Sequence, residues 1–462
     1  MSDFTPSLVT LARWSSALQL ADIPPAVRAA ARRCLIDTLG VALAGSRSAV
    51  AEQARTVAGL CAAKGHSAVF GQRDSLAAPA AAFVNATAAH ALDFDDNCYP
   101  GFVHGSALIM PAALAVAQMR DLSGAQLLAA FVAGAECEYA LAKALSRQIY
   151  DRGWWTTGVL GVVGACAAAS HALGLNADQT AAALAIAITG TGGMKAGFGS
   201  DAKMLLAGRS SEAGVVAALL ASHGSSGPLA VVEHEKGLAA MFNDGLLMPL
   251  PKLGSVWSLI EPGVDIKRVP VCLSSHAAID ALREMLEPGE IRVSDIGKII
   301  CDVPPIVIQN LIHDAPITRQ QAQFSMPFAL ACTALLGDIT LASLDPGVLA
   351  RPDLRQLMGR VRMGSSERWQ SALLDTAPEG AWVRVLRHDG SSVERFCAMP
   401  LGAASRPLSA EQLHDKFMHC SGDALGDIRA QRLFDDLLRL EQLPEVRRLL
   451  APEALTVETI ES

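Results

Sequence analysis

The feature that most constrains this chain is an uncharged segment, residues 153–177, which contains no Asp, Glu, Lys or Arg. It is long enough to cross a bilayer as a helix. Gly and Ala dominate it, however, Leu is sparse, and His171 and Asn176 interrupt it. Small residues let helices approach closely in a packed interior. We therefore expect a buried helix of a soluble bundle and no membrane partner.

Both ends of the chain have helical patterns. From Ser7 to about Ile260, apolar residues recur at three- and four-residue spacing, with breaks at Gly, Pro and Asn. After residue 400 the helical pattern returns, and Ser409 and Gln412 have the spacing of a capping box. The pattern predicts helices at residues 25–44, 77–91, 107–119, 124–146 and 177–188.

The middle of the chain is different. Short β-branched runs stand at residues 298–303, 360–363 and 382–386, and a helical pattern stands at 275–286. Asp389-Gly390 precedes another such run at 393–398, which predicts a β-hairpin. We therefore predict a mainly α fold, with a large all-α helical domain formed by both chain ends (residues 1–265 and 400–462) and a smaller inserted α+β domain (residues 266–399).

Composition excludes several classes of protein. With 51% hydrophobic and 18% charged residues, 462 residues can bury at least one full core. A net charge of -8 without a dense Lys/Arg run argues against a nucleic-acid partner. The ten cysteines are scattered with no Cys-x-x-Cys, which indicates reduced thiols, a cytoplasmic protein and no structural zinc. The N-terminus has no secretory signal pattern.

The first group of candidate catalytic residues follows the predicted helix at residues 77–91. Asp93, Asp95 and Asp96 stand within four residues, and such carboxylates repel one another unless a cation or donor holds them. The alternative is a helix cap and a solvated turn. His104 lies between two glycine-containing loops, and an imidazole suits a proton carrier near neutral pH.

Two further groups contain cations. The glycine-rich stretch 192–203 fits neither phosphate-binding glycine pattern, which argues against a nucleotide site, but Lys203 beside it can bind a carboxylate or act as a base. Lys267 and Arg268 precede Pro270 and a helix start, where they predict an anion clamp at the domain junction. The alternative is a basic linker, with Ser275 capping the next helix.

Taken in order, these three segments resemble the MmgE/PrpD family. Asp37-Thr-Leu-Gly40 near the start and Lys416-Phe417 near the end add to the resemblance, and Phe83-Val-Asn85 through His90 to Asp96 is its most specific part. The resemblance implies an enzyme without cofactor or metal, built from a helical and an α+β domain, usually as a homodimer. Family activities are 2-methylcitrate dehydration, cis-aconitate decarboxylation and iminodisuccinate epimerisation, all on small polycarboxylates.

The resemblance carries active-site roles onto Asp93, His104, Lys203 and Lys267, with Asn97 where a small hydroxyl residue is common. The chain departs from the family pattern at three places. Trp155 and Cys272 stand where decarboxylase- and dehydratase-like members tend to have histidines, and Ile308 stands where cis-aconitate decarboxylase-like members have a tyrosine. Trp155 removes one acid of the dehydratase pattern.

Family chemistry removes a proton next to a carboxylate, which needs a base and a fixed positive charge. We predict an epimerase of an imino- or amino-dicarboxylate such as iminodisuccinate, with His104 opposed to a lysine and oriented by Asp93. The alternative is a 2-methylcitrate dehydratase-like hydro-lyase. The residues predicted to bind the substrate are Lys267, Asn97, Arg268, Arg209, Tyr150, Trp155 and Cys272.

Two other classes of protein fit less well. A magnesium-dependent isoprenoid enzyme needs a second acidic motif and an aromatic pocket, whereas this chain has only 5% aromatic residues. A non-catalytic scaffold has no need of cations such as Lys203 in a cleft.

Overall fold

The computed structural model describes residues 5–99, 101–145 and 148–450, and the chain divides into two compact units. Unit 1 comprises residues 1–265 and 409–462, and unit 2 comprises residues 266–408. The structure is 59% helical and 9% strand, so the mainly α class is confirmed. The return to unit 1 comes at Ser409 rather than residue 400, because Leu401 donates its backbone N–H to Asp280 and Gly402 accepts one from Ile266, all within unit 2.

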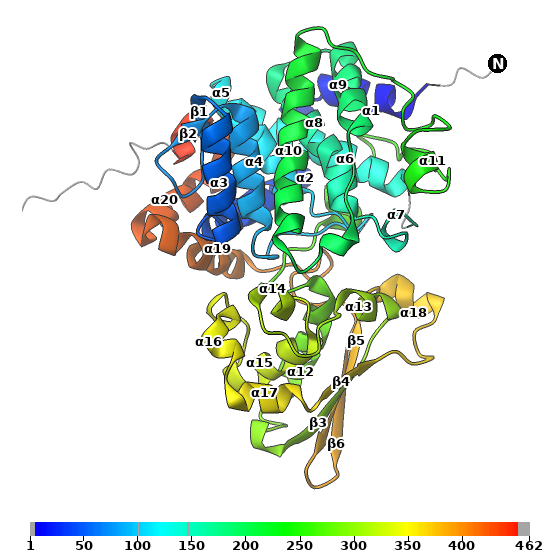
Figure 1. The fold of residues 1–462 in the computed structure, drawn as a ribbon, viewed down its shortest axis with the longest axis vertical. Coiled ribbons are helices and arrows are strands. Elements are labelled where there is room, and N and C mark those ends of the chain that lie inside the picture. Colours follow the sequence, from blue (N-terminus) through cyan, green and yellow to red (C-terminus); the bar gives the residue numbers. More distant parts are fainter. Residues whose placement is uncertain (1–4, 100, 146–147, 451–462) are drawn as a thin grey trace, which may run out of the picture. The chain divides into compact units, whose positions relative to one another are not determined.

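Helices make up almost all of unit 1 (Figure 1). Each of the five predicted helices begins and ends within one residue of its predicted bounds over the described residues. The helices are α1 (Ser7–Ala17), α2 (Pro25–Gly45), α3 (Ala49–Cys61), α4 (Ala78–His90), α5 (Ser106–Met119), α6 (Gly124–Leu145), α7 (Gln148–Asp151), α8 (Thr156–Leu173), α9 (Ala177–Thr189), α10 (Asp201–Ser222), α11 (Leu238–Phe242), α19 (Ala410–Leu425) and α20 (Asp427–Leu438). A small antiparallel pair, β1 (Lys64–Ala68) and β2 (Ser75–Leu76), lies beside α5.

Helix α8 is the centre of unit 1 and packs against α5, α6, α9 and α10. Its approach to α6 is close because both helices have glycine at the crossing. A Cβ added at Gly134 would lie 2.6 Å from the carbonyl oxygen of Gly164. The uncharged segment of the sequence therefore forms a buried helix, as predicted.

Among the residues that the structure describes, two helices, α8 and α10, are long and apolar enough to cross a membrane. By the same measure, α2 and α3 pass only as a pair bent by 87°. In α8, 89% of the apolar window is buried within the protein, against 56% in α10. Protein packing thus accounts for the composition of α8, while α10 presents part of an apolar face at the surface.

Unit 2 is an α+β unit around one four-stranded sheet. The strands are β3 (Ile296–Asp302), β4 (Val361–Gly364), β5 (Ala381–Arg387) and β6 (Ser392–Cys397), in the order β4-β3-β5-β6. Strand β4 runs parallel to β3, and the other pairs are antiparallel. The predicted hairpin is confirmed, since β5 and β6 are joined through Gly390 with φ of 86°.

Helices α12 (His276–Leu286) and α15 (Met326–Leu336) pack on each other and on the sheet. The shorter helices of unit 2 are α13 (Pro305–Asn310), α14 (Arg319–Ala322), α16 (Pro346–Leu349), α17 (Pro352–Met358) and α18 (Ser371–Thr376).

The C-terminal helices join the N-terminal ones in unit 1. The predicted capping box is present, because Ser409 and Gln412 exchange hydrogen bonds of 2.9 and 3.1 Å at the start of α19. Helix α19 then packs on α2, where Lys416 Nζ lies 2.6 Å from Asp37 Oδ1. The two chain ends are therefore joined by a buried ion pair.

All ten cysteines are free thiols, and eight of them are buried. This agrees with the prediction of reduced thiols.

Candidate active site

The turn after α4 and the starts of α5, α8 and α10 bring the acidic and basic residues of unit 1 together. His104 lies just before α5, and its backbone N–H donates to Thr157 Oγ1 at 3.0 Å. Its Nδ1 lies 2.8 Å from the carbonyl oxygen of Asp96. Because a carbonyl only accepts hydrogen bonds, Nδ1 carries the hydrogen. Nε2 of His104 is therefore the nitrogen that can take a proton.

A second histidine lies beside His104. His90 ends α4, and its Nδ1 is 2.7 Å from Asp95 Oδ2. The same carboxylate oxygen lies 3.5 Å from Nδ1 of His104. His90 and Asp95 are fully buried, and the indole of Trp155 stacks on His90 with ring centroids 5.2 Å apart. Asp95 thus lies between two imidazoles.

Lys203 brings a cation to the same region from α10. Its Nζ donates to Asp93 Oδ1 at 2.8 Å, and both side chains are 3% exposed. The ammonium lies 5.6 Å from the Trp155 ring centroid and 5.0 Å from that of Phe198. A Cβ added at Gly208 would meet Phe83 O at 2.5 Å. Glycine there lets α10 approach α4 closely enough for the Lys203–Asp93 pair.

Asp93 adopts a backbone conformation that few residues tolerate. Its φ is 49°, in the left-handed region, where Asp and Asn are the most common residues after Gly. This local bend turns the chain directly after α4, so that Asp93 and Asp95 can face different partners.

Three helices begin at this site. Thr157, in the first turn of α8, accepts a hydrogen bond from the backbone N–H of His104, which stands just before α5. Trp155, the residue before α8, lies near Lys203 in the first turn of α10. The start of a helix carries partial positive charge and unpaired N–H groups. Together with Lys203, these helix starts favour an anion.

Lys416 supports the turn from the opposite end of the sequence. Besides its pair with Asp37, its Nζ donates to the Phe94 carbonyl at 3.0 Å and lies 3.9 Å from the Phe94 ring centroid. Asp37 and Lys416, whose motifs resemble those of the MmgE/PrpD family, therefore contact each other next to the segment that carries Asp93 and Asp95.

Two buried carboxyl groups near the turn have pKa values well above the ordinary range of a carboxyl group. Burial raises the pKa of Asp96 to about 7, against the lowering effect of the nearby Ser106 hydroxyl. Burial, together with the charge of Asp96, raises the pKa of Glu138 to about 8. Neither carboxyl oxygen of Glu138 has a hydrogen-bond partner in the part of the chain that the structure describes.

We expect Glu138→Gln to make the protein more stable at alkaline pH. In the unfolded chain this carboxyl ionises near pH 4.5, whereas in the folded protein it ionises near pH 8. The wild-type fold therefore loses stability as the pH rises between these values. Glu138→Gln should remove that loss and raise the free energy of unfolding near pH 8 by about 1 kcal/mol or more.

Urea unfolding near pH 5 and pH 8 measures this effect. Glu235→Gln, at an exposed position, is the control and should match the wild type within about 0.5 kcal/mol at both pH values. An identical pH dependence in Glu138→Gln and the wild type would contradict the assignment.

Four predicted substrate-binding residues lie in unit 1. Trp155 is buried in the site, and Asn97 is buried with its backbone paired to Asp265. Tyr150 is buried beneath Lys195, whose Nζ lies 3.6 Å from its ring centroid. Arg209 is different, because it is exposed on α10 and paired with Glu212 at 2.6 Å. Its contacts give no support to a role in the site.

The remaining predicted residues belong to unit 2. Lys267 is 1% exposed, and its binding of a substrate carboxylate stays a prediction. Arg268 holds Asp338 and, at 3.1 Å, Asp280, so its guanidinium is part of an ion-pair network of unit 2 rather than a free anion clamp. Cys272 is half-buried, with its Sγ 3.6 Å from the Ser274 hydroxyl.

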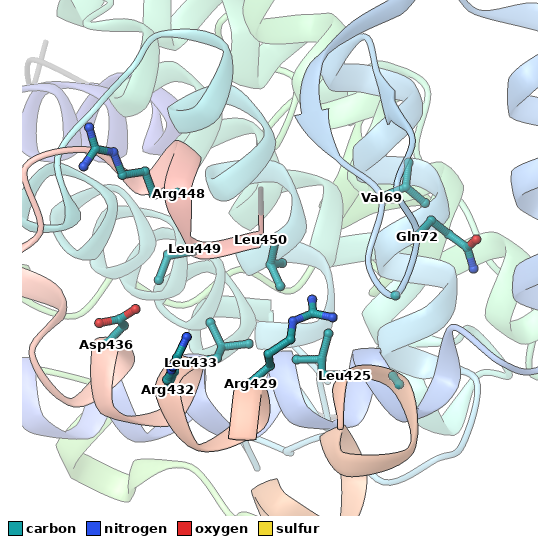
Figure 2. Close-up of a pocket in the computed structure, with 12 residues that line it drawn as sticks. Val69, Gln72, Leu425, Arg429, Arg432, Leu433, Asp436, Arg448, Leu449 and Leu450 are labelled. Atoms are coloured by element: carbon teal, nitrogen blue, oxygen red, sulfur yellow. The ribbon is translucent and has the colours of Figure 1, made fainter. Parts of the chain in front are cut away.

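A separate pocket of about 150 Å³ lies beside α20 (Figure 2). Arg429 and Arg432 line it together with Leu433 and Leu450. Burial and the charge of Arg73 lower the pKa of Arg429. None of the site residues predicted from sequence lines this pocket.

From the sequence we predicted that Asp93 orients His104. In the structure, Asp93 pairs with Lys203, and Asp95 lies beside His104. It also missed the roles of His90 and Thr157. The acidic run signalled a site, but spacing alone does not tell which carboxylate faces which partner across a left-handed bend.

Buried His–Asp and Lys–Asp pairs meet at converging helix starts in a mainly helical fold, an arrangement suited to acid–base chemistry. The MmgE/PrpD N-terminal domain matches residues 9–248, and the MmgE/PrpD C-terminal domain matches residues 269–440. The chain belongs to the MmgE/PrpD family, as the resemblance predicted.

Curated relatives cover nearly the whole chain. The human cis-aconitate decarboxylase is 29% identical, over 90% of this chain and 87% of its own length. A cis-aconitate decarboxylase-like protein of Aspergillus oryzae is 27% identical over 98% of both chains, and the cis-aconitate decarboxylase of Aspergillus terreus is 25% identical over 95% and 94%. These relatives are named for a lyase reaction, so the predicted epimerase finds no support among them and the lyase alternative fits better.

Proposed function

We propose that this protein is a lyase that acts, without a cofactor, on a small di- or tricarboxylate and breaks a bond close to one of its carboxylates. The observation that carries the proposal is the site of unit 1, where His104 has one nitrogen fixed as a donor and the Lys203 ammonium donates to Asp93. The decarboxylase relatives make a lyase the preferred class.

Charge supports a substrate with several carboxylates. Lys203 and the starts of α5, α8 and α10 offer positive potential where the acidic turn would otherwise repel an anion. The buried Asp96 and Glu138 reduce that repulsion, because their raised pKa values keep much of their charge neutralised at neutral pH.

The chemistry needs one proton carrier and one fixed positive charge. In a decarboxylation, the C–CO2 bond breaks, its electron pair stays on the substrate, and a carbon of the substrate takes a proton from protonated His104. In a dehydration, Nε2 of His104 takes a proton from the carbon next to a carboxylate, and hydroxide leaves with a proton from a second donor. In both reactions Lys203 stabilises the negative charge that develops on the carboxylate.

Trp155 does not by itself decide between the two reactions. Decarboxylase- and dehydratase-like members of the family both tend to carry a histidine at its position, and the Trp155 indole, which stacks on His90 and lies near Lys203, offers no proton at neutral pH. Dehydration requires a second acid, whereas release of CO2 needs none. The preference for decarboxylation therefore rests on the decarboxylase relatives.

Proton NMR in D2O tests the proposal with cis-aconitate, 2-methylcitrate, citrate and iminodisuccinate, each incubated separately with the enzyme. We expect a new alkene from cis-aconitate with release of CO2, and activity that survives EDTA. A new alkene from citrate or 2-methylcitrate, without CO2, would make the enzyme a dehydratase. The control is the same panel with heat-inactivated enzyme.

Two results would overturn the proposal that the protein is a cofactor-free lyase. The first is deuterium entering iminodisuccinate with interconversion of its stereoisomers and no alkene from any acid, which would establish the epimerase. The second is loss of activity in EDTA that one divalent metal restores, which would replace the cofactor-free chemistry.

A further inference from the structure

We propose that Asp95 is a positioning residue that holds His104 and provides the counter-charge for its protonated form, with His90 keeping the Asp95 carboxylate in place. The inference rests on the proposed function only for its kinetic readout. It assigns to Asp95 the role toward His104 that we predicted for Asp93.

Distances support this arrangement. Asp95 Oδ2 lies 2.7 Å from Nδ1 of His90 and 3.5 Å from Nδ1 of His104. The imidazole rings of His90 and His104 have centroids 5.0 Å apart. A carboxylate within 4 to 6 Å of an imidazole favours the charged imidazolium, and the effect is stronger when water is excluded. Asp95 is fully buried, so solvent screens its charge little.

The other charged groups around His104 are less suited to this role. Lys203 neutralises Asp93 at 2.8 Å. Burial raises the pKa of Asp96 to about 7, so this carboxyl is largely protonated in slightly acidic solution, and it is the backbone carbonyl of Asp96 that meets His104. Helix α8 contributes uncharged Thr157 and Trp155.

His90 has a supporting task. Asp95 Oδ2 accepts the Nδ1–H of His90 at 2.7 Å, and Nε2 of His90 is buried and has no hydrogen-bond partner among the described residues. His90 thus directs one donor at Asp95, and Trp155 stacks on its ring and fixes its orientation.

The same three residues have the ligand types of a metal site, since their nearest donor atoms lie within 4.8 Å of one another. Hydrogen bonds explain the arrangement of these three residues better than a bound metal ion does. Nδ1 of His104 already donates to the Asp96 carbonyl and Nδ1 of His90 to Asp95, so both nitrogens nearest the centre carry hydrogen. A metal would have to displace both hydrogens.

Histidine NMR of the full-length protein tests the proposal without a substrate. The His104 signal is assigned by its loss in His104→Gln, and its titration is followed in the wild type, Asp95→Asn and Asp96→Asn. In Asp95→Asn we expect the midpoint of the His104 titration to fall by about one pH unit or more. Asp96→Asn is the matched control, with the same change at the next residue, and should shift the midpoint less. The His171 signal, whose Nε2 lies 2.9 Å from Leu18 O, should not move if the fold is intact.

Kinetics provide the second readout. On the acid that the NMR panel identifies, kcat of Asp95→Asn should fall about tenfold or more while KM stays within about threefold. If no acid in the panel is turned over, the proposed function fails, but the His104 titration still tests the role of Asp95. If Asp95→Asn does not fold, Asp95→Asn/His90→Phe removes both partners of the buried pair and should show the same fall in midpoint.

Three results would overturn the proposal: an unchanged His104 midpoint in Asp95→Asn, a shift at least as large in Asp96→Asn, or stoichiometric binding of Zn²⁺ in calorimetry that is lost in Asp95→Asn. The last would make His90, Asp95 and His104 a metal centre.

Discussion

Replacing His104 by Gln should lower kcat by about 10²- to 10⁴-fold, the usual contribution of a positioned acid–base group. The Gln amide can still donate to the Asp96 carbonyl, which His104 Nδ1 meets at 2.8 Å. It cannot take or give a proton, so the variant isolates proton transfer from the packing of the turn. Steady-state rates on the acid identified by NMR, together with circular dichroism, measure turnover and folding.

His419→Gln is the matched control for this variant. His419 is exposed on α19, and its Nδ1 lies 2.9 Å from the carbonyl oxygen of Asp415 in the same helix. The control should keep wild-type rates. Full activity in His104→Gln would remove His104 from the mechanism and leave Lys203 as the candidate proton carrier.

The sequence predicted the helical elements well because their signals are local. Apolar spacing, the Ser409–Gln412 capping box and the Asp389-Gly390 turn each depend on a few neighbouring residues. The boundary at residue 400 was less accurate, since the chain up to Leu408 is held in unit 2 by contacts to Asp280 and Ile266 that are distant in sequence.

The residues that cluster in unit 1 were predictable from the sequence, and the pairings among them were less so. His104, Lys203 and Asp93 do belong to one region of unit 1, but the partner of each depends on geometry. The left-handed bend at Asp93 and the close α4–α10 contact at Gly208 decide that Asp93 meets Lys203. Arg268 is a second example, because its ion pairs with Asp280 and Asp338 in unit 2 could not be seen in the sequence.

Lys203→Met should have the largest combined effect, abolishing measurable turnover and lowering the free energy of unfolding by about 3 to 5 kcal/mol. Lys203 and Asp93 are both buried and lie 2.8 Å apart. Removing the ammonium leaves the Asp93 carboxylate buried without its ion-pair partner, and the substrate loses its fixed positive charge. Chemical denaturation and steady-state kinetics measure the two losses separately.

The double variant Asp93→Asn/Lys203→Met separates stability from catalysis. Asn tolerates the left-handed backbone of Asp93, whose φ is 49°, and removing both charges eliminates the unpaired carboxylate. The double variant should therefore regain most of the stability lost in Lys203→Met, as replacing both partners of a buried ion pair often does. Turnover should stay abolished, because the site still lacks its cation. Recovery of activity along with stability would show that the ion pair only supports the fold, and the charge that stabilises the reaction would then have to come from another residue.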